Sequence, residues 1–225
     1  MSHQPETWRW GDDTSRLVMA LDRGDFLAIP TESSYGLAAD PRSATGVASV
    51  FRFKGRPPEK PLPVVLGDLA QLTLLGGDPS ASELAELRTL WPAPLTVIVP
   101  IRRPLPASAG ASSLAVRIPA HRRLRSLLLA LNRPLTATSA NPAGREPVSK
   151  LVDLHRLLAA WPAIILDDGD LPGGLASTIV QWTTDGLVVL REGAIDRKWL
   201  QAKVSQPVFS AATAEISADD PAEPL

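Results

Sequence analysis

Short apolar runs alternate along this chain with amphipathic segments of helical period, and this alternation limits the folds that the chain can adopt. Helices are expected over residues 12–24, 43–53, 79–90, 121–131 and 148–158. Strands are expected over residues 26–29, 62–66, 96–99, 114–118, 135–138, 164–166, 178–182 and 187–190. Helices and strands intermixed in this order predict an α/β fold, a single domain with a twisted, mixed β-sheet flanked by helices.

The last two expected strands are separated by the turn Thr183-Thr184-Asp185-Gly186, which predicts a β-hairpin. Ligand sites in open α/β sheets gather at strand ends, so we also expect a substrate cavity there. The polar residues found at expected strand ends are Thr31 to Tyr35, Lys54 to Lys60, Arg117, Ser139 to Asn141, Ser177 and Arg191.

The length of 225 residues suits one domain or a tightly packed pair of domains. Hydrophobic residues make up 44% of the chain and charged residues 21%, which is typical of globular proteins and excludes collagen-like and coiled-coil chains. We expect one folded domain over residues 12–204. Residues 205–225 are rich in Ala, Ser and Pro and carry acids but no base, so we expect a disordered acidic tail there.

The absence of cysteine excludes disulfides, thiolate nucleophiles, zinc ribbons and iron–sulfur clusters. The histidines, His3, His121 and His155, are widely separated, so we expect no protein metal site. We expect His121 and His155 to lie on the surface or to pack against helices. No apolar stretch approaches the ~18 residues of a transmembrane helix, and the charged opening residues do not resemble a signal peptide. These features predict a cytoplasmic protein with no membrane partner.

Basic residues are concentrated in two places, although the formal net charge is only −1. Residues 117–150 hold many Arg and Lys residues against the single acid Glu146. The second concentration comprises Arg52, Lys54, Arg56 and Lys60. Two local basic clusters on a nearly neutral chain favour a focused anion site over a general nucleic-acid surface. Solvated surface charge is the alternative interpretation.

Two short polar motifs could bind a polyanion. Lys54 and Arg56 flank a glycine and precede two prolines, so a rigid loop would present two cations to phosphate oxygens. A solvated loop after a helix is the alternative. Ser139 and Asn141 could offer a hydroxyl and an amide to phosphate or sugar, and a capped turn is the alternative. The motifs of P-loops, dinucleotide folds, zinc proteases and nucleophile elbows are absent.

Three further residues stand out beside apolar strands. Thr31 and Ser177 are small hydroxyl residues at expected strand ends, and each could instead satisfy the local backbone. Arg117 lies within an apolar strand, where a positive charge needs either a structural partner or an anionic ligand. The residues alone leave both roles open for Arg117.

Seven segments are specific as an ordered set: PTESSYGLAAD, KGRPPEKPL, WPAPLT, LAVRIPAH, TSANPAG, ASTIV and LREGAI. In these segments, over about Leu17 to Ile195, the chain resembles the YrdC-like threonylcarbamoyl-AMP synthase family. The resemblance implies a YrdC-like fold and a nucleotidyltransferase that joins L-threonine, bicarbonate and ATP into threonylcarbamoyl-AMP and releases pyrophosphate. That product supplies the threonylcarbamoyladenosine modification of tRNA, so tRNA and the tRNA-modification proteins that accept it are implied partners.

The resemblance also implies roles for single residues. Lys54 and Arg56 match the family K-x-R and are implied in catalysis. The residues implied in ATP binding are Lys54, Arg56, Ser139, Asn141 and Arg191. The residues implied in threonine binding are Thr31, Arg117 and Ser177. Mg²⁺ is expected to arrive with the ATP phosphates, because no carboxylate cage is evident.

Two segments depart from the family pattern. Val65 stands where many relatives carry histidine, and residues 143–147 replace an S-G-x-x-S segment. A paralogue acting on another small acid is therefore a second hypothesis, and a non-catalytic RNA-binding module is a third. Aromatic residues make up only 5% of the chain and form no RNP-like cluster, so the sequence favours ATP chemistry over base stacking.

Overall fold

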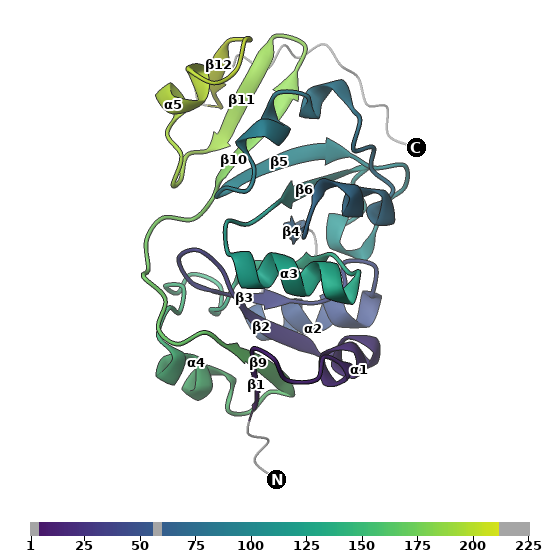
Figure 1. Ribbon diagram of the computed structural model, residues 1–225, viewed down its shortest axis with the longest axis vertical. Helices are drawn as coiled ribbons and strands as arrows, with labels where there is room; N and C mark the ends of the chain where they lie inside the picture. Colours follow the sequence, from purple (N-terminus) through teal and green to yellow (C-terminus); the bar gives the residue numbers. More distant parts are fainter. Residues whose placement is uncertain (1–4, 56–59, 212–225) are drawn as a thin grey trace.

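Two mixed β-sheets with helices packed around them make up the computed structural model, which describes residues 5–55 and 60–211 (Figure 1). The α/β class is confirmed, but the expectation of a single sheet is wrong. The chain crosses from one sheet to the other at Ala137, because β7 (Leu135–Thr136) pairs in the second sheet and β8 (Thr138–Ser139) pairs in the first. Among the described residues, no helix has the length and apolar character needed to cross a membrane.

The first sheet has the strand order β1-β9-β2-β3-β8. Its remaining strands are β1 (Glu6–Arg9), β2 (Phe26–Pro30), β3 (Tyr35–Ala38) and β9 (Ala163–Asp167). Strands β1, β9 and β2 are parallel, whereas β3 is antiparallel to both of its neighbours. The folded region therefore begins before residue 12, where the sequence placed its start, because β1 pairs along its whole length with β9.

Helices cover both faces of the first sheet. The alternation of side chains along β2 sends Phe26 and Ala28 into one buried cluster and Leu27 and Ile29 into the other. The first cluster includes side chains of α2 (Ala44–Lys54) and α4 (Leu151–Leu158), and the second includes those of α1 (Ser15–Arg23) and α3 (Arg122–Leu131). A strand buried on both faces explains why residues 26–29 are continuously apolar.

Local capping residues set the ends of these helices. Ser43 accepts a hydrogen bond from the Gly46 N–H at 3.1 Å at the start of α2, as the sequence predicts. Gly24 ends α1 in the left-handed region, with φ of 84°. The predicted cap of α1 is wrong by one or two residues. Thr14 occupies the cap position, while the Asp13 carboxylate accepts the Ser15 N–H at 3.0 Å.

The second sheet has the order β12-β11-β10-β5-β6-β4-β7. Its remaining strands are β4 (Val64–Val65), β5 (Leu95–Pro100), β6 (Ser113–Arg117), β10 (Thr178–Thr183), β11 (Gly186–Arg191) and β12 (Val208–Ser210). Strands β10 and β11 form the predicted hairpin. A long segment, residues 168–177, runs along one side of the molecule from β9 to β10 and so joins the two sheets (Figure 1).

The helix predicted over residues 79–90 is not formed as one element. The chain makes two short 3₁₀ helices there, Ser82–Leu84 and Leu87–Leu90. Leu84 and Leu87 are the buried leucines of this stretch and are three residues apart, which suits tighter turns with three residues each. Further 3₁₀ helices span Leu69–Leu75 and Pro106–Ser108.

The disordered tail predicted over residues 205–225 is wrong for its first seven residues. Residues 205–211 are folded, because β12 pairs in parallel with β11 and Val208 is buried. Before β12, the short helix α5 (Arg197–Gln201) places Leu200 in the core. The rest of the predicted tail, residues 212–225, lies outside the described residues.

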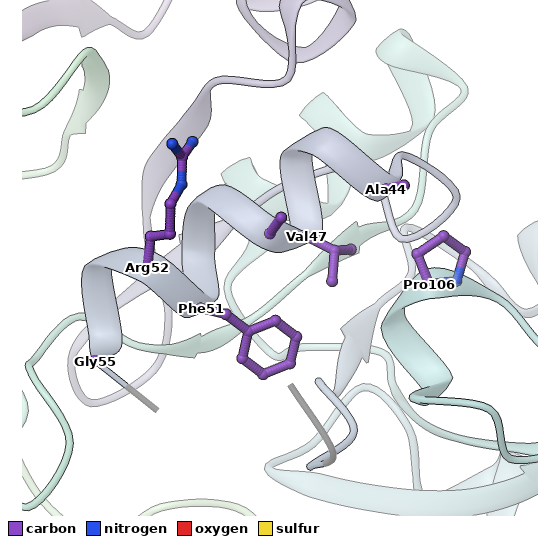
Figure 2. A pocket seen from close by; sticks show the side chains of 7 residues that line it. Ala44, Val47, Phe51, Arg52, Gly55 and Pro106 are labelled. Atoms are coloured by element: carbon purple, nitrogen blue, oxygen red, sulfur yellow. The ribbon is translucent and has the colours of Figure 1, made fainter. Parts of the chain in front are cut away.

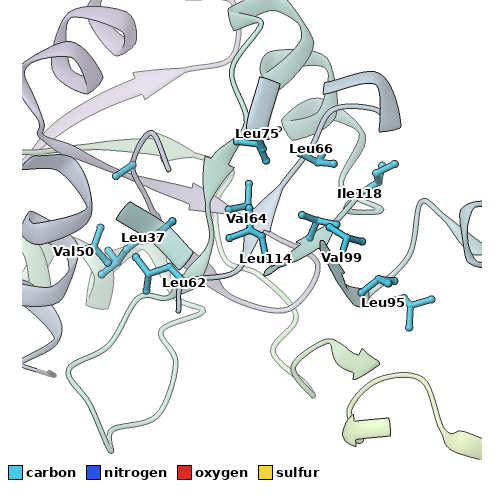
Figure 3. Close-up of a cluster of buried hydrophobic side chains, with 14 of the residues drawn as sticks. Leu37, Val50, Leu62, Val64, Leu66, Leu75, Leu95, Val99, Leu114 and Ile118 are labelled. Carbon is cyan, nitrogen blue, oxygen red and sulfur yellow. The ribbon is translucent and has the colours of Figure 1, made fainter. Parts of the chain in front are cut away.

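The larger apolar core extends across both sheets. It contains Phe26 and Leu37 from the first sheet and Val97 and Val116 from the second. Figure 3 shows Leu37 and Val50 at one end of this cluster and Leu95 and Val99 at the other. The two sheets are therefore parts of one packed body.

Candidate active site

Four neighbouring inner strands of the second sheet have ends that lie side by side, and this row of strand ends is here called the edge of the sheet. Strand β6 ends at Arg117 and β11 ends at Arg191, whereas β5 and β10 begin there. The register places Arg191 opposite Ile179, and Ile179 opposite Thr96. Three predicted site residues, Arg117, Ser177 and Arg191, therefore come together from distant parts of the sequence.

Ser177 is the centre of a small polar group at this edge. Its hydroxyl oxygen lies 2.9 Å from the hydroxyl oxygen of Thr96. A terminal nitrogen of Arg191 donates to the Ser177 carbonyl oxygen at 2.8 Å. Partial burial and the positive charge of Arg117 lower the pKa of the Arg191 guanidinium. Two guanidinium groups that repel each other in this way favour the binding of an anion between or beside them.

Arg117 is held by a carboxylate that the sequence reasoning missed. A terminal nitrogen of Arg117 lies 3.0 Å from one carboxylate oxygen of Glu32, and the other oxygen accepts the Ala120 N–H at 2.7 Å. Burial lowers the pKa of Arg117, and the charge of Glu32 opposes that effect. Of the two roles left open for Arg117, the structural ion pair is therefore present. The one sequence feature that could have indicated a role for Glu32 is its position in the PTESSYGLAAD segment.

Thr31 lies in the loop between β2 and β3. Its hydroxyl donates to the Ser34 carbonyl oxygen at 2.8 Å, which closes a tight turn. In the same loop the carbonyl oxygen of Ser33 accepts the Gly173 N–H at 2.9 Å, so the loop also contacts the segment 168–177. Thr31 is buried and satisfies the local backbone in this structure.

Lys54, Ser139 and Asn141 form a second group beside the first sheet. The Lys54 ammonium donates to the Ser139 carbonyl at 2.7 Å, the Asn141 carbonyl at 3.0 Å and the Asn141 side-chain oxygen at 3.1 Å. Lys54 is 5% exposed, so the alternative interpretation of a solvated loop is wrong for this residue. Arg56, the other cation of the motif, lies outside the described residues.

The loop of Thr31 connects the two groups. Gly36 follows this loop and pairs with Ser139 in β8. A Cβ on Gly36 would lie 3.3 Å from the Thr138 carbonyl oxygen and 3.8 Å from the Thr31 methyl carbon. Glycine therefore allows the two strands and Thr31 to approach closely. The segment over residues 31–36, which comprises this loop and the start of β3, thus contacts Arg117 through Glu32 and pairs with Ser139 through Gly36.

Thr178 and Gly193 shape the loop after β11. The Thr178 hydroxyl accepts the N–H groups of Gly193 at 2.9 Å and Ile195 at 3.0 Å. A Cβ on Gly193 would collide with the Ala176 carbonyl oxygen. These contacts hold the ASTIV and LREGAI segments together and keep Arg191 over Ser177.

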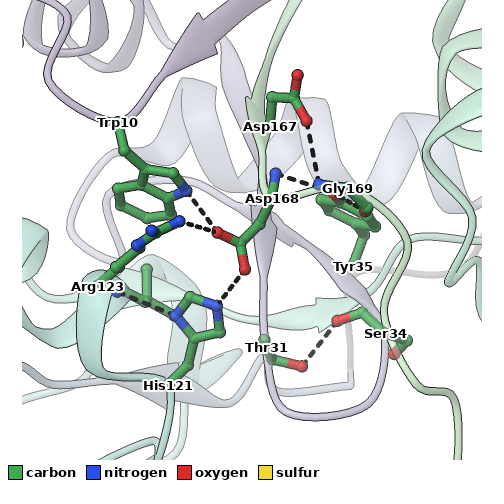
Figure 4. A network of polar contacts seen from close by, with 10 residues as sticks. Trp10, Thr31, Ser34, Tyr35, His121, Arg123, Asp167, Asp168 and Gly169 are labelled. Carbon is green, nitrogen blue, oxygen red and sulfur yellow. Dashed lines mark hydrogen bonds and ion pairs between the residues drawn. The ribbon is translucent and has the colours of Figure 1, made fainter.

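Asp168 binds a further group of residues near the same loop (Figure 4). Its carboxylate accepts the Trp10 indole N–H at 2.6 Å and an Arg123 N–H at 3.1 Å, and it lies 2.9 Å from His121 Nε2. His121 Nδ1 accepts the Leu124 N–H at 3.2 Å, so Nε2 carries the hydrogen that faces Asp168. His121 thus packs at the start of α3, as expected, and His155 is half-buried on α4.

Two cavities in the described part of the chain are lined by residues other than those of these groups. The first, of about 500 Å³, lies along α2 (Figure 2). It is lined by Arg52 and Gly55 and by the apolar residues Ala44, Val47, Ala48, Phe51 and Pro106. The second, of about 550 Å³, lies at the start of α5. Neither is lined by a predicted site residue, so the substrate cavity at the strand ends stays a prediction. The described residues also contain no group of three His, Asp or Glu side chains that could hold a metal ion.

Comparisons with known proteins agree on one family. The family model Sua5_yciO_yrdC, described as "Telomere recombination", matches residues 19–193. A threonylcarbamoyl-AMP synthase of Chromohalobacter salexigens is 38% identical over 164 residues, which are 72% of this chain and 88% of that protein. The threonylcarbamoyl-AMP synthase of Bacillus subtilis is 30% identical over 82% of this chain. This chain spans only 54% of the length of the Bacillus protein.

A solved structure supports the fold. The crystal structure of P. abyssi Sua5 complexed with L-threonine matches with a TM-score of 0.78 and 27% identity. The match covers 96% of this chain and 65% of that one. The fold is therefore shared with a protein that was crystallised with L-threonine.

Proposed function

Because the chain belongs to the Sua5–YciO–YrdC family, we propose that it is an L-threonylcarbamoyladenylate synthase. It condenses L-threonine, bicarbonate and ATP into threonylcarbamoyl-AMP and pyrophosphate. The observation that carries the proposal is the meeting of Arg117, Ser177 and Arg191 at one sheet edge, with Lys54, Ser139 and Asn141 on the other side of one loop. One group suits a carboxylate and the other suits a nucleotide.

Threonine binds at the edge of the second sheet. Arg117 offers N–H groups to its carboxylate, because a guanidinium can grip two carboxylate oxygens. Ser177 and Thr31 provide hydroxyl and backbone groups within the same region. The P. abyssi structure named above supports this assignment, since that protein was crystallised with L-threonine.

ATP binds over the K-x-R and S-x-N motifs. The Lys54 ammonium lies against Ser139 and Asn141, so the cation, the hydroxyl and the amide are close enough together to contact one nucleotide. Arg56 and Arg191 add positive charge to neutralise the triphosphate. Mg²⁺ enters with the phosphates, which supply the oxygen ligands that it prefers.

The reaction needs positioning and charge neutralisation more than a protein nucleophile. The threonine nitrogen adds to bicarbonate, and water leaves, to form a carbamate. A carbamate oxygen then attacks the α-phosphorus in line, and the bond to the bridging oxygen breaks as pyrophosphate leaves. The product carries its activated threonylcarbamoyl group to tRNA through the proteins that use it.

A paralogue that acts on a different small acid is the second candidate. Val65 is the observation that favours it, because this side chain is 1% exposed and lies opposite Arg117 in the register of β4 and β6. The wall beside Arg117 is therefore apolar at this position. A non-catalytic RNA-binding module remains the third candidate.

Pyrophosphate release from ATP, measured with each amino acid in turn, distinguishes the three candidates. In buffer depleted of carbon dioxide, release should require L-threonine and added bicarbonate together, because the carbamate is the nucleophile. Equal release without bicarbonate would contradict the carbamate mechanism. A higher kcat/KM for another amino acid would favour the paralogue. RNA binding without release for any amino acid would favour the RNA-binding module.

A further inference from the structure

Glu32 contacts both the last residue of β6 and the segment that follows this strand. One oxygen of its carboxylate contacts Arg117 at 3.0 Å, and the other accepts the backbone N–H of Ala120 at 2.7 Å. Glu32 lies 85 residues before Arg117 in the sequence and comes from the loop of the first sheet. A single side chain therefore fixes both the guanidinium of Arg117 and the backbone three residues later.

This ion pair is largely shielded from water. The side chains of Arg117 and Glu32 are 11% and 19% exposed. A charge pair at this depth is weakly screened, and removing one partner leaves the other without compensation. Arg191 lies close enough to oppose the charge of Arg117, so loss of Glu32 would increase the repulsion between the two arginines.

The pair still leaves Arg117 able to bind a ligand. Among the described residues, Glu32 is the only hydrogen-bond acceptor for the Arg117 guanidinium, and it uses one terminal nitrogen. The other terminal nitrogen and Nε keep their N–H groups for another acceptor. With two guanidinium groups and one carboxylate, this edge also retains one positive charge, which suits one carboxylate ligand.

We propose that Glu32 is a positioning residue for substrate binding: it fixes the orientation of Arg117 so that the remaining N–H groups meet the carboxylate of the amino acid. This inference rests on the proposed function and adds a residue to it. A guanidinium held in place before binding loses less side-chain entropy when the ligand arrives. Glu32 acts through its contact with Arg117, so its effect should appear in threonine affinity.

The test compares Glu32→Gln with the natural chain. The glutamine side chain keeps the size and one oxygen for the Ala120 N–H but removes the negative charge. Calorimetric titration with L-threonine should show a Kd at least ~10-fold higher, and the KM for threonine should rise in parallel while the KM for ATP stays within about twofold. Glu83→Gln, an exposed carboxylate on a 3₁₀ helix, is the matched control and should leave both constants unchanged.

A double-variant comparison shows whether Glu32 acts through Arg117. In an Arg117→Lys background, Glu32→Gln should change threonine affinity much less than it does alone, because the residue to be positioned has been altered. Glu32→Asp, which keeps the charge, should bind threonine more tightly than Glu32→Gln. If Glu32→Gln proves too unstable to purify, Glu32→Asp, whose carboxylate is one methylene shorter, is compared with the natural chain instead, and an unchanged Kd for threonine in that variant overturns the inference.

The possible results separate this inference from the proposed function. Unchanged or tighter threonine binding by Glu32→Gln overturns the inference, since Glu32 would then be structural only or a competitor of the ligand carboxylate. Fully additive effects in the double variant also overturn it. Failure of the natural chain to bind threonine or to release pyrophosphate overturns the proposed function itself, whatever the variants do.

Discussion

Lys54 shows that a charged residue can have a structural role when it is buried. In the sequence it is one of several cations after a helix, and a solvated loop is a reasonable alternative. In the structure its ammonium is enclosed and donates to three oxygen atoms of residues 139 and 141. A buried ammonium needs such partners, because burial of an unpaired charge costs several kcal/mol. Lys54 therefore has a structural role in addition to the proposed role toward ATP.

Lys54→Met should lower stability as well as ATP use. Methionine has similar length but no donor, so three oxygen atoms lose a hydrogen bond, and we expect the free energy of unfolding to fall by about 1–3 kcal/mol. Urea unfolding followed by circular dichroism measures this change. Lys198→Met, at an exposed position on α5, is the control and should stay within about 0.5 kcal/mol of the natural chain. Equal stability of both variants would show that Lys54 is not held as described.

Asp168 should contribute to the pH dependence of stability. Burial alone would raise the pKa of Asp168, but the hydrogen bonds from His121, Trp10 and Arg123 lower it below its ordinary value. A lowered carboxylate pKa stabilises the folded state above about pH 4, and this stabilisation is lost as the pH falls through the folded-state pKa.

Asp168→Asn should remove this effect. We expect the variant to be less stable than the natural chain by about 1 kcal/mol near pH 7, a value reduced for solvent screening, and the difference should shrink as the pH falls below about 4. Urea midpoints measured from about pH 2 to 7 test this expectation. Asp153→Asn, on the exposed side of α4, is the control. A difference that is constant with pH would contradict the assignment.

Among the secondary-structure elements, some short strands form only because they pair with a neighbouring strand. Strand β12 has three residues and a polar surrounding sequence, so no periodic pattern marks it. It forms because the Leu187 N–H donates to the Pro207 carbonyl at 2.9 Å and the Ala211 N–H donates to the Val189 carbonyl at 3.0 Å. Gly186 is required at this contact, since a Cβ there would collide with the Pro207 carbonyl.

Removal of β12 should destabilise the protein. A chain that ends at Gln206 loses the strand and the burial of Val208, which contributes about 1.5–3 kcal/mol. In a chain of this size we expect Tm to fall by about 3–12 °C relative to a chain that ends at Ala211. Differential scanning calorimetry of the two truncated chains measures the difference. Equal melting temperatures would mean that β12 adds no stability.

The whole molecule has two sheets but a shared core. Apolar side chains from both sheets belong to the same buried cluster, and the chain crosses between the sheets from β3 to β4, at Ala137 and over residues 168–177. The ion pair of Glu32 and Arg117 adds a polar link across the same boundary. An extensive shared core is typical of a single cooperative unit.

We therefore expect the two sheets to unfold together. Native-state hydrogen exchange should give the slowest amides of β2 and β5 the same opening free energy, within about 1 kcal/mol. Urea curves from tryptophan fluorescence and far-ultraviolet circular dichroism should coincide. Separate opening energies for β2 and β5 would show that each sheet is an independent folding unit.

Local features of the fold could be predicted because they depend on residues close together in the sequence. The apolar run of β2, the cap of α2 at Ser43 and the hairpin of β10 and β11 all follow from side-chain period, capping or turn residues. The ordered motifs also indicate the family without any knowledge of the geometry. The sequence by itself determined the fold class, most helix and strand positions and the family.

Tertiary structure decided which of these elements meet. Strand period reports that a face is buried, but it does not identify the neighbouring strand, so the division into two sheets could not be predicted. The pairing of Glu32 with Arg117 joins residues 85 positions apart, and that of Lys54 with Ser139 also spans 85. The carboxylate of Asp168 reaches Trp10 across 158 residues. Such contacts depend on the packing of distant elements, because side-chain period and composition contain no information on which charged groups will be buried together.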